Sequence, residues 1–168
     1  MPKVRVKRHA VTQPSDTSYR LIPLTQCKNA IVDCADFKFL SQWNWTASRH
    51  RNRFYAVRCE NGVRFYMHRV LLAIESKETD HKNGNSLDNR RENLRSCTRS
   101  RNACNMPLSS VSTTGYRGVT RSGSRWQAQC TEGGKYFFLG RFADKQDAAR
   151  AYDSFVKLRR GEFARTNF

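Results

Sequence analysis

The chain has 168 residues, which is room for one ordinary domain or two small ones. It carries 31 Lys and Arg against 14 Asp and Glu, a net charge of +17 that favours a polyanionic partner, nucleic acid before an anionic membrane. Aromatic residues make up 11% of the chain, which excludes wholesale disorder, and no apolar run has transmembrane length.

The first part of the chain divides into an arm and the start of an ordered unit. Residues 1–20 are basic and polar, with Pro and Ser/Thr, and predict a flexible basic arm. Asp33 can cap a helix over 34–42, with Asp36 as the second member of a capping box. Phe37, Leu40 and Trp43 share one face of that helix and predict its buried side.

Two strands follow, over residues 53–59 and 63–68. The Asn61-Gly62 pair between them is typical of a tight hairpin turn. A further helix can begin over 69–74. The six Cys residues form no C-x-x-C pair, so the zinc-ribbon signature is missing, and each Cys is expected to be reduced and buried.

A change of composition separates the C-terminal part. Residues 106–114 (MPLSSVSTT) predict a linker. Residues 115–143 alternate like strands, with turns at Ser122-Gly123 and Gly133-Gly134. A helix is expected over 145–160, between an Asp144 cap and Gly161. Its predicted apolar face consists of Ala148, Ala151, Tyr152, Phe155 and Leu158.

The polar segment from Asp80 to Asn105, DHKNGNSLDNRRENLRSCTRSRNACN, contains residue types that handle a hard metal ion and a phosphate. Together with MHRVLL (67–72), it resembles the HNH nuclease motif of phage and intron-encoded homing endonucleases. Asn93 follows His81 by twelve positions and Asn102 follows it by twenty-one. The resemblance covers roughly residues 20–105 and implies a two-stranded ribbon and a helix that grip one metal ion.

The resemblance implies a role for each of four residues. Asp80 and Asn102 would bind the metal, His81 would be the general base, and Asn93 would hold the loop. Oxygen ligands suit Mg²⁺ or Mn²⁺, one ion per site. An imidazole is mostly neutral at pH 7 and can take a proton from water. Asp80 and His81 would project to opposite sides of a strand.

His68 and the arginines leave alternatives open. His68 either touches a phosphate or braces the fold. Arg69, Arg95 and Arg99 belong to a larger set of guanidinium groups that could clamp phosphates, and a solvated surface is the alternative for any one of them.

Residues 115–168 carry YRGV (116–119), RWQAQ (125–129), FLGRF (138–142), DAARAYD (147–153) and a closing NF. They resemble the apetala-two, or ethylene-response-factor, DNA-binding domain. The resemblance implies three antiparallel strands on one helix, with the sheet in the DNA major groove. Strand alternation and the resemblance together predict a DNA-binding set: Arg117, Arg121, Arg125, Gln127, Gln129, Tyr136 and Arg141.

These observations predict an α+β protein. An N-terminal mixed α/β unit leads into a ββα-metal nuclease core, followed by the three-stranded sheet packed on one helix. The expected domains are the arm 1–20, a nuclease domain 21–105 with its core at about 77–105, the linker 106–114 and a DNA-binding domain 115–168.

The expected function is metal-dependent cleavage of double-stranded DNA by an intracellular, cytoplasmic homing-type or phage enzyme. Monomer and homodimer both remain open. The main alternative is a sequence-specific DNA-binding regulator with an inactive nuclease core, and a remoter one is an RNA-binding scaffold. Metal-dependent cleavage, or its absence beside DNA binding, separates the first two.

Overall fold

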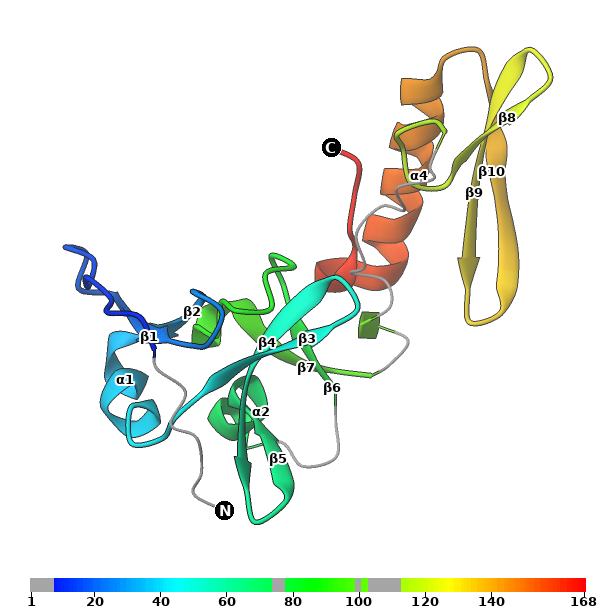
Figure 1. The fold of residues 1–168 in the computed structure, drawn as a ribbon. Helices are drawn as coiled ribbons and strands as arrows, with labels where there is room; N and C mark the ends of the chain where they lie inside the picture. The colour runs from blue at the N-terminus through cyan, green and yellow to red at the C-terminus, as the bar shows by residue number, and fades with distance from the viewer. Residues whose placement is uncertain (1–7, 74–77, 99–100, 103–112) are drawn as a thin grey trace. The chain divides into compact units, whose positions relative to one another are not determined.

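The computed structural model describes residues 8–73, 78–98, 101–102 and 113–168 (Figure 1). It contains two compact units, Met1–Cys97 and Thr98–Phe168. The division falls before the predicted nuclease boundary at residue 105, and most of the predicted linker lies outside the described residues. Small antiparallel sheets and short helices alternate along the chain, which is a mixed α+β composition.

The N-terminal unit begins with a two-stranded sheet that the sequence did not predict. Strands β1 (Tyr19–Pro23) and β2 (Asn29–Asp33) pair antiparallel, and helix α1 (Cys34–Leu40) follows at once. The predicted basic arm is attached to this unit at two points. The Arg8 guanidinium donates to the Trp45 carbonyl at 2.8 and 3.0 Å, and the Gln13 side chain bonds both backbone groups of Leu21.

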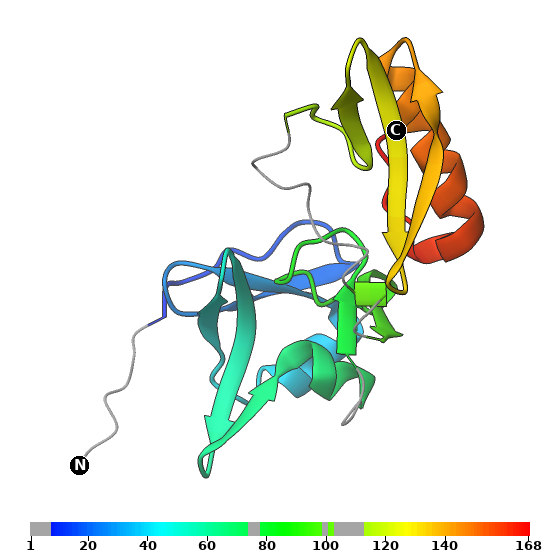
Figure 2. The same ribbon diagram turned by 90° about the vertical axis from the view of Figure 1, so that its right-hand side faces the viewer.

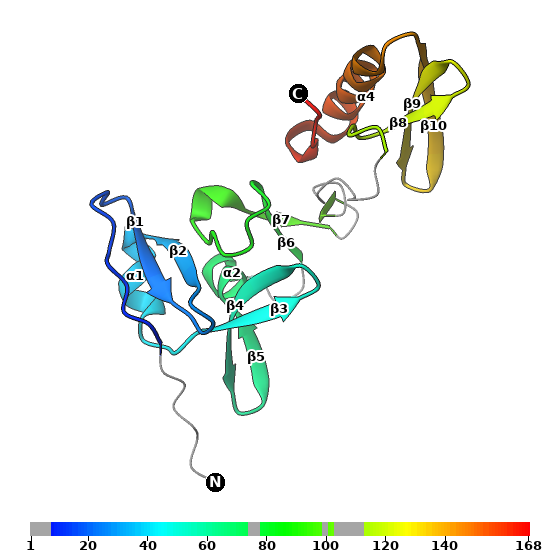
Figure 3. The same ribbon diagram turned by 45° about the horizontal axis from the view of Figure 1, so that its top comes forward.

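A three-stranded antiparallel sheet comes next, in the order β3 (Thr46–His50), β4 (Arg53–Glu60) and β5 (Val63–Tyr66) (Figure 3). The predicted hairpin turn is confirmed, because Asn61 and Gly62 both have positive φ, +50° and +77°. Residues 67 and 68, expected at the end of the second strand, instead open helix α2 (Met67–Leu72).

One apolar core holds these elements together. Leu24, Val32, Leu40, Trp45 and Met67 have no exposed surface. The Trp45 indole N–H donates to the Leu40 carbonyl at 2.8 Å, so its burial leaves no unmet donor. The predicted buried side of the first helix is confirmed, since Phe37 and Trp43 pack against this core.

Strands β6 (Glu78–His81) and β7 (Leu94–Cys97) form a separate two-stranded antiparallel sheet. The loop between them ends in the short 3₁₀ helix η1 (Arg91–Asn93) and lies against β2. The loop contacts β2 through backbone hydrogen bonds. The Ile31 N–H donates to the Leu87 carbonyl at 2.9 Å, and the Asn89 N–H donates to the Ile31 carbonyl at 2.7 Å. The N-terminal sheet therefore supports the loop.

Asp33 is the N-cap residue of α1, as predicted, but the predicted capping hydrogen bonds of the Asp33 and Asp36 side chains are wrong. The Asp33 side chain makes no cap hydrogen bond to α1 and instead accepts from the Arg91 backbone N–H at 2.7 Å, at the start of η1. The Asp36 carboxylate binds the Arg91 guanidinium through two hydrogen bonds of 2.8 and 2.9 Å. Both carboxylates therefore bind Arg91 on the β6–β7 loop instead of the backbone of their own helix. The charged guanidinium is a stronger hydrogen-bond partner for Asp36 than a backbone N–H would be.

The C-terminal unit is a three-stranded antiparallel sheet with one helix on one of its faces (Figure 2). Its strands are β8 (Val119–Ser122), β9 (Arg125–Glu132) and β10 (Lys135–Phe142), with β9 in the middle. Helix α4 (Lys145–Arg160) and the short 3₁₀ helix η2 (Gly161–Phe163) complete it. Both predicted turns lie between these strands.

The predicted ends of α4 are confirmed, and its apolar face needs one correction. Asp144 accepts from the Gln146 N–H at 2.6 Å, and Gly161 ends the helix with φ +52°. Leu158 is 86% exposed and lies outside the buried face. The other four predicted residues face the core: Ala148 and Tyr152 are buried, and Ala151 and Phe155 pack against it partly buried. Ala149 and Val156 are buried as well.

Two further expectations concern thiols and membranes. The described Cys residues carry thiols and form no disulfide, but Cys27, Cys34 and Cys59 are exposed, so among them burial holds for Cys97 and Cys130. Cys104 lies outside the described residues. Within the parts of the chain that the structure describes, no helix has the length and apolar character needed to cross a bilayer.

Candidate active site

Asp80 and His81 lie side by side at the end of β6, and both are buried, with 2% and 4% of their surface exposed. The antiparallel register places Asp80 opposite Arg95 and His81 opposite Leu94 on β7. Because neighbouring residues of a strand project to opposite sides, the two side chains meet different surroundings.

Two other rings contact the His81 imidazole, and a third packs behind them. His68, from the start of α2, stands edge-on to it with ring centroids 5.2 Å apart, and Tyr55 from β4 lies 6.3 Å away. Tyr66 completes this aromatic cluster of Tyr55, Tyr66, His68 and His81, at 5.5 Å from His68. His68 is therefore brought to the predicted site, and its 6% exposure favours the bracing interpretation over phosphate contact.

Burial favours the neutral form of both histidines. Burial lowers the pKa of His81, against the opposing effects of the Asn89 side chain and of the Asp80 and Asp88 carboxylates. Burial, helped by His81 and Arg69, lowers the pKa of His68 to about 3. A neutral imidazole at position 81 is the form that can accept a proton.

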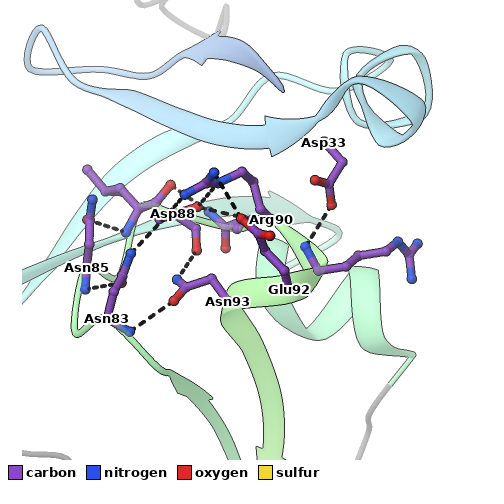
Figure 4. A network of polar contacts seen from close by, with 10 residues as sticks. Asp33, Asn83, Asn85, Asp88, Arg90, Glu92 and Asn93 are labelled. Carbon is purple, nitrogen blue, oxygen red and sulfur yellow. Dashed lines mark hydrogen bonds and ion pairs between the residues drawn. The ribbon is translucent and has the colours of Figure 1, made fainter. Parts of the chain in front are cut away.

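Asn93 ties together the loop that follows His81 (Figure 4). Its side-chain oxygen accepts from the Asn83 backbone N–H at 3.0 Å, and its side-chain N–H donates to the Asp88 carbonyl at 2.8 Å. Its own carbonyl accepts from the Lys82 N–H at 2.9 Å. With 6% of its surface exposed, Asn93 has the contacts expected of a residue that holds the loop.

Asp88 is a second anchor of the loop that the sequence did not single out. Its carboxylate receives the Arg90 guanidinium at 2.8 and 2.9 Å and the Asn83 amide at 2.9 Å (Figure 4). Burial alone would raise the pKa of Asp88, but the hydrogen bonds from Arg90 outweigh it and the pKa is lowered. In the sequence, only the Asp, Asn and Arg content of the loop could have indicated this role of Asp88. The same composition is also typical of a plain turn.

Arg95 does not have the exposed position expected of a phosphate clamp. Its side chain is only 10% exposed, and its Nε and Nη2 atoms donate to Asp80 Oδ2 at 2.8 and 2.6 Å. The strand register causes this, because it places the two residues directly opposite each other. Arg69 is exposed and lies over the Tyr66 ring, and Arg99 lies outside the described residues.

The remaining predicted metal ligand, Asn102, belongs to the other unit, so its approach to Asp80 stays a prediction. It is helical, and its N–H donates to the Thr98 carbonyl at 2.9 Å. Among the described residues, no group of three or more His, Cys, Asp or Glu side chains could hold a metal ion. The Asp80 carboxylate is a hard oxygen donor suited to Mg²⁺ or Mn²⁺, but it could only be one ligand of several.

The exposed face of the C-terminal sheet gathers most of the predicted DNA-binding residues. Gln127 lies opposite Thr120 on β8 and Arg141 on β10, and these three share the face turned away from α4. Arg125, Gln129 and Tyr136 lie on the same face by strand alternation and register. The side chains of Gln127, Gln129 and Tyr136 hydrogen-bond one another at 2.8 to 2.9 Å, which fixes their polar groups.

Two predicted members do not share that face. Val119 pairs with the buried Ala128, so Arg121, two residues along β8, lies on the helix side and over the Trp126 ring. Arg117 precedes β8, and burial lowers its pKa. The predicted alternation agrees with the structure within each strand, but the register between β8 and β9 decides which residues of the two strands share a face.

One comparison with known proteins gives a match. A family model described as HNH endonuclease matches residues 73–104. The matched segment thus carries the motif of a nuclease family. It includes Asp80, His81, Asn93 and Asn102, and HNH nucleases generally depend on a divalent metal. No curated protein gives a match to the chain. The match ends before the C-terminal sheet, so the apetala-two resemblance depends on sequence motifs alone.

Proposed function

We propose that this protein is a metal-dependent endonuclease that hydrolyses phosphodiester bonds in double-stranded DNA. The observation that carries the proposal is a buried, neutral His81 beside Asp80 at the end of β6, inside the segment that matches the HNH endonuclease family. The family match supports a nuclease, and the charge of +17 favours a polyanionic substrate.

In this proposal, His81 removes a proton from the water that attacks the phosphorus. The aromatic cluster holds the imidazole and keeps it in its base form, and Asn93 fixes the loop that leaves β6. Asp80 and Asn102 would hold Mg²⁺ or Mn²⁺, which when bound would neutralise charge on the phosphate and on the leaving oxygen.

The C-terminal unit would supply the DNA contacts. Arg125, Arg141 and the hydrogen-bonded Gln127, Gln129 and Tyr136 form an exposed polar sheet face. Gln can read adenine edges and Arg can read guanine edges in a major groove. Such a face fits the apetala-two resemblance. Together with a nuclease unit, it would suit a homing-type or phage enzyme that acts inside a cell.

Cleavage of a randomised duplex library tests this proposal. The wild-type protein should cut selected sequences in Mg²⁺ or Mn²⁺ and should leave them intact in EDTA. His81→Ala should bind the selected duplexes and leave them uncut, while the exposed His50→Ala serves as the matched control that still cuts them. Binding by wild type without any metal-dependent cleavage would support the alternative, a DNA-binding regulator with an inactive nuclease core.

A further inference from the structure

The ion pair between Asp80 and Arg95 occupies one oxygen of the carboxylate that the proposed function assigns to the metal. Arg95 Nε and Nη2 both donate to Oδ2 of Asp80, at 2.8 and 2.6 Å. The two side chains are 2% and 10% exposed, so water screens this pair very little. The β6–β7 register sets the pair, because it places the two residues directly opposite each other.

Asp88 and Asp36 also have arginine partners. Asp88 is bound to Arg90 at 2.8 Å, and Asp36 is bound to Arg91 at 2.8 Å. Each of these three carboxylates therefore has an arginine partner, and the formal charge of each pair is zero. A divalent cation that approaches Asp80 therefore meets little net electrostatic attraction unless Arg95 moves away.

We propose that Arg95 competes with the divalent metal for the Asp80 carboxylate and thereby sets the metal affinity of the free protein. The inference builds on the proposed function. A phosphodiester of bound DNA offers the guanidinium fork a new partner of the right geometry. Departure of Arg95 to that phosphate frees the carboxylate, so metal and DNA each strengthen the binding of the other.

A purely structural ion pair makes a different prediction. Replacing Arg95 would then leave a buried carboxylate without its partner and would weaken the fold with or without metal. Under the competition model, the metal replaces the lost guanidinium and restores the fold.

Binding of Mn²⁺ to the free, full-length protein separates the two models without any cleavage assay. Titration calorimetry and thermal unfolding with and without Mn²⁺ are measured for wild type, Arg95→Gln and the matched control Arg91→Gln, whose arginine pairs with Asp36 instead. Arg95→Gln should bind Mn²⁺ about tenfold more tightly than wild type, because a charged competitor is gone. Arg91→Gln should match wild type.

Three outcomes would overturn the inference. Arg95→Gln could bind Mn²⁺ no more tightly than wild type, it could stay unfolded at saturating Mn²⁺, or Asp80→Asn/Arg95→Gln could keep the gain in affinity. The proposed function fails separately, if the wild-type protein cuts no DNA while Mn²⁺ binding behaves as expected.

Discussion

His68 links the aromatic cluster to the stability of the N-terminal unit. Its Nδ1 atom is buried and has no hydrogen-bond partner among the described residues, and its pKa is lowered to about 3. The folded protein thus holds His68 without a proton across a pH range in which an unfolded chain, with a pKa near 6.5, binds one.

The sign of the pH dependence follows from this difference. Between about pH 6.5 and 3 the unfolded state binds the extra proton, so the free energy of unfolding should fall as the pH falls. One such group contributes at most about 1.4 kcal/mol per pH unit. Denaturant unfolding at several pH values should give a shallower slope for His68→Phe, which keeps an aromatic ring at the position. The exposed His50→Phe is the control, and equal slopes for all three proteins would contradict the account.

Asn93 permits a second test at a single side chain. Asn93→Ala removes the partner of the Asn83 N–H and of the Asp88 carbonyl, so we expect a loss of about 1–3 kcal/mol in the free energy of unfolding. Cleavage should fall as well, because the loop that leaves His81 loses its tie. Asn85→Ala, at an exposed residue whose side chain caps a local turn, should cost less. A loss at Asn93 no larger than that at Asn85 would argue against its anchoring role.

At the scale of elements, local signals in the sequence predicted the parts with strong turn and cap residues. The Asn61-Gly62 hairpin, the strands and turns of the C-terminal sheet and both ends of α4 agree with the structure. Strands β1 and β2 lacked such signals. Strand β2 also bonds through its backbone to a loop more than fifty residues away, which a local pattern cannot contain.

The candidate active site also has residues that the sequence predicted and partners that it did not. The HNH resemblance of one segment predicted Asp80, His81 and Asn93 as site residues, whereas the partners of these residues depend on tertiary contacts. The register of β6 and β7 places Arg95 on Asp80, and the packing of α2 brings His68 to His81. Likewise, the β8–β9 register moves Arg121 off the exposed face, and no alternation within one strand could reveal it.

Gly118 tests the packing of the C-terminal unit. It has φ +66°, and a Cβ atom there would overlap the Tyr152 ring on α4. Gly118→Ala should therefore cost about 2–4 kcal/mol in unfolding free energy. Gly123→Ala is the matched control: its φ is +61°, but nothing lies within 4 Å of the added Cβ, so only about 1 kcal/mol is expected. Circular dichroism during thermal unfolding measures both, and equal losses would contradict the packing argument.

At the scale of the whole molecule, two units with different surfaces share one excess of positive charge. In the proposed function, one unit cleaves and the other adds base contacts, and their tether raises the local concentration of each on the same DNA. Affinity should weaken with salt by about 0.9 log units per neutralised phosphate for each log unit of salt.

The contribution of the exposed sheet face to DNA binding can be measured separately from the general electrostatic attraction. Gln127→Ala should reduce binding to a selected duplex by about 1–3 kcal/mol, because a base contact is lost, and should leave the salt slope unchanged. Arg150→Ala, on the exposed side of α4, is the control and should bind the selected duplex as wild type does. Fluorescence anisotropy at several salt concentrations measures both. Equal affinity of Gln127→Ala for selected and random duplexes, at the wild-type level, would remove the sheet face from recognition.

The proposed function requires His81 to act as the general base of a DNA hydrolase. Single-turnover cleavage of a selected duplex in Mg²⁺ or Mn²⁺, with DNA affinity measured on the same samples, tests it most directly. His81→Ala should cleave about 10²–10⁴-fold more slowly than wild type while its DNA affinity stays within about threefold. Cleavage by His81→Ala at the wild-type rate would contradict the claim.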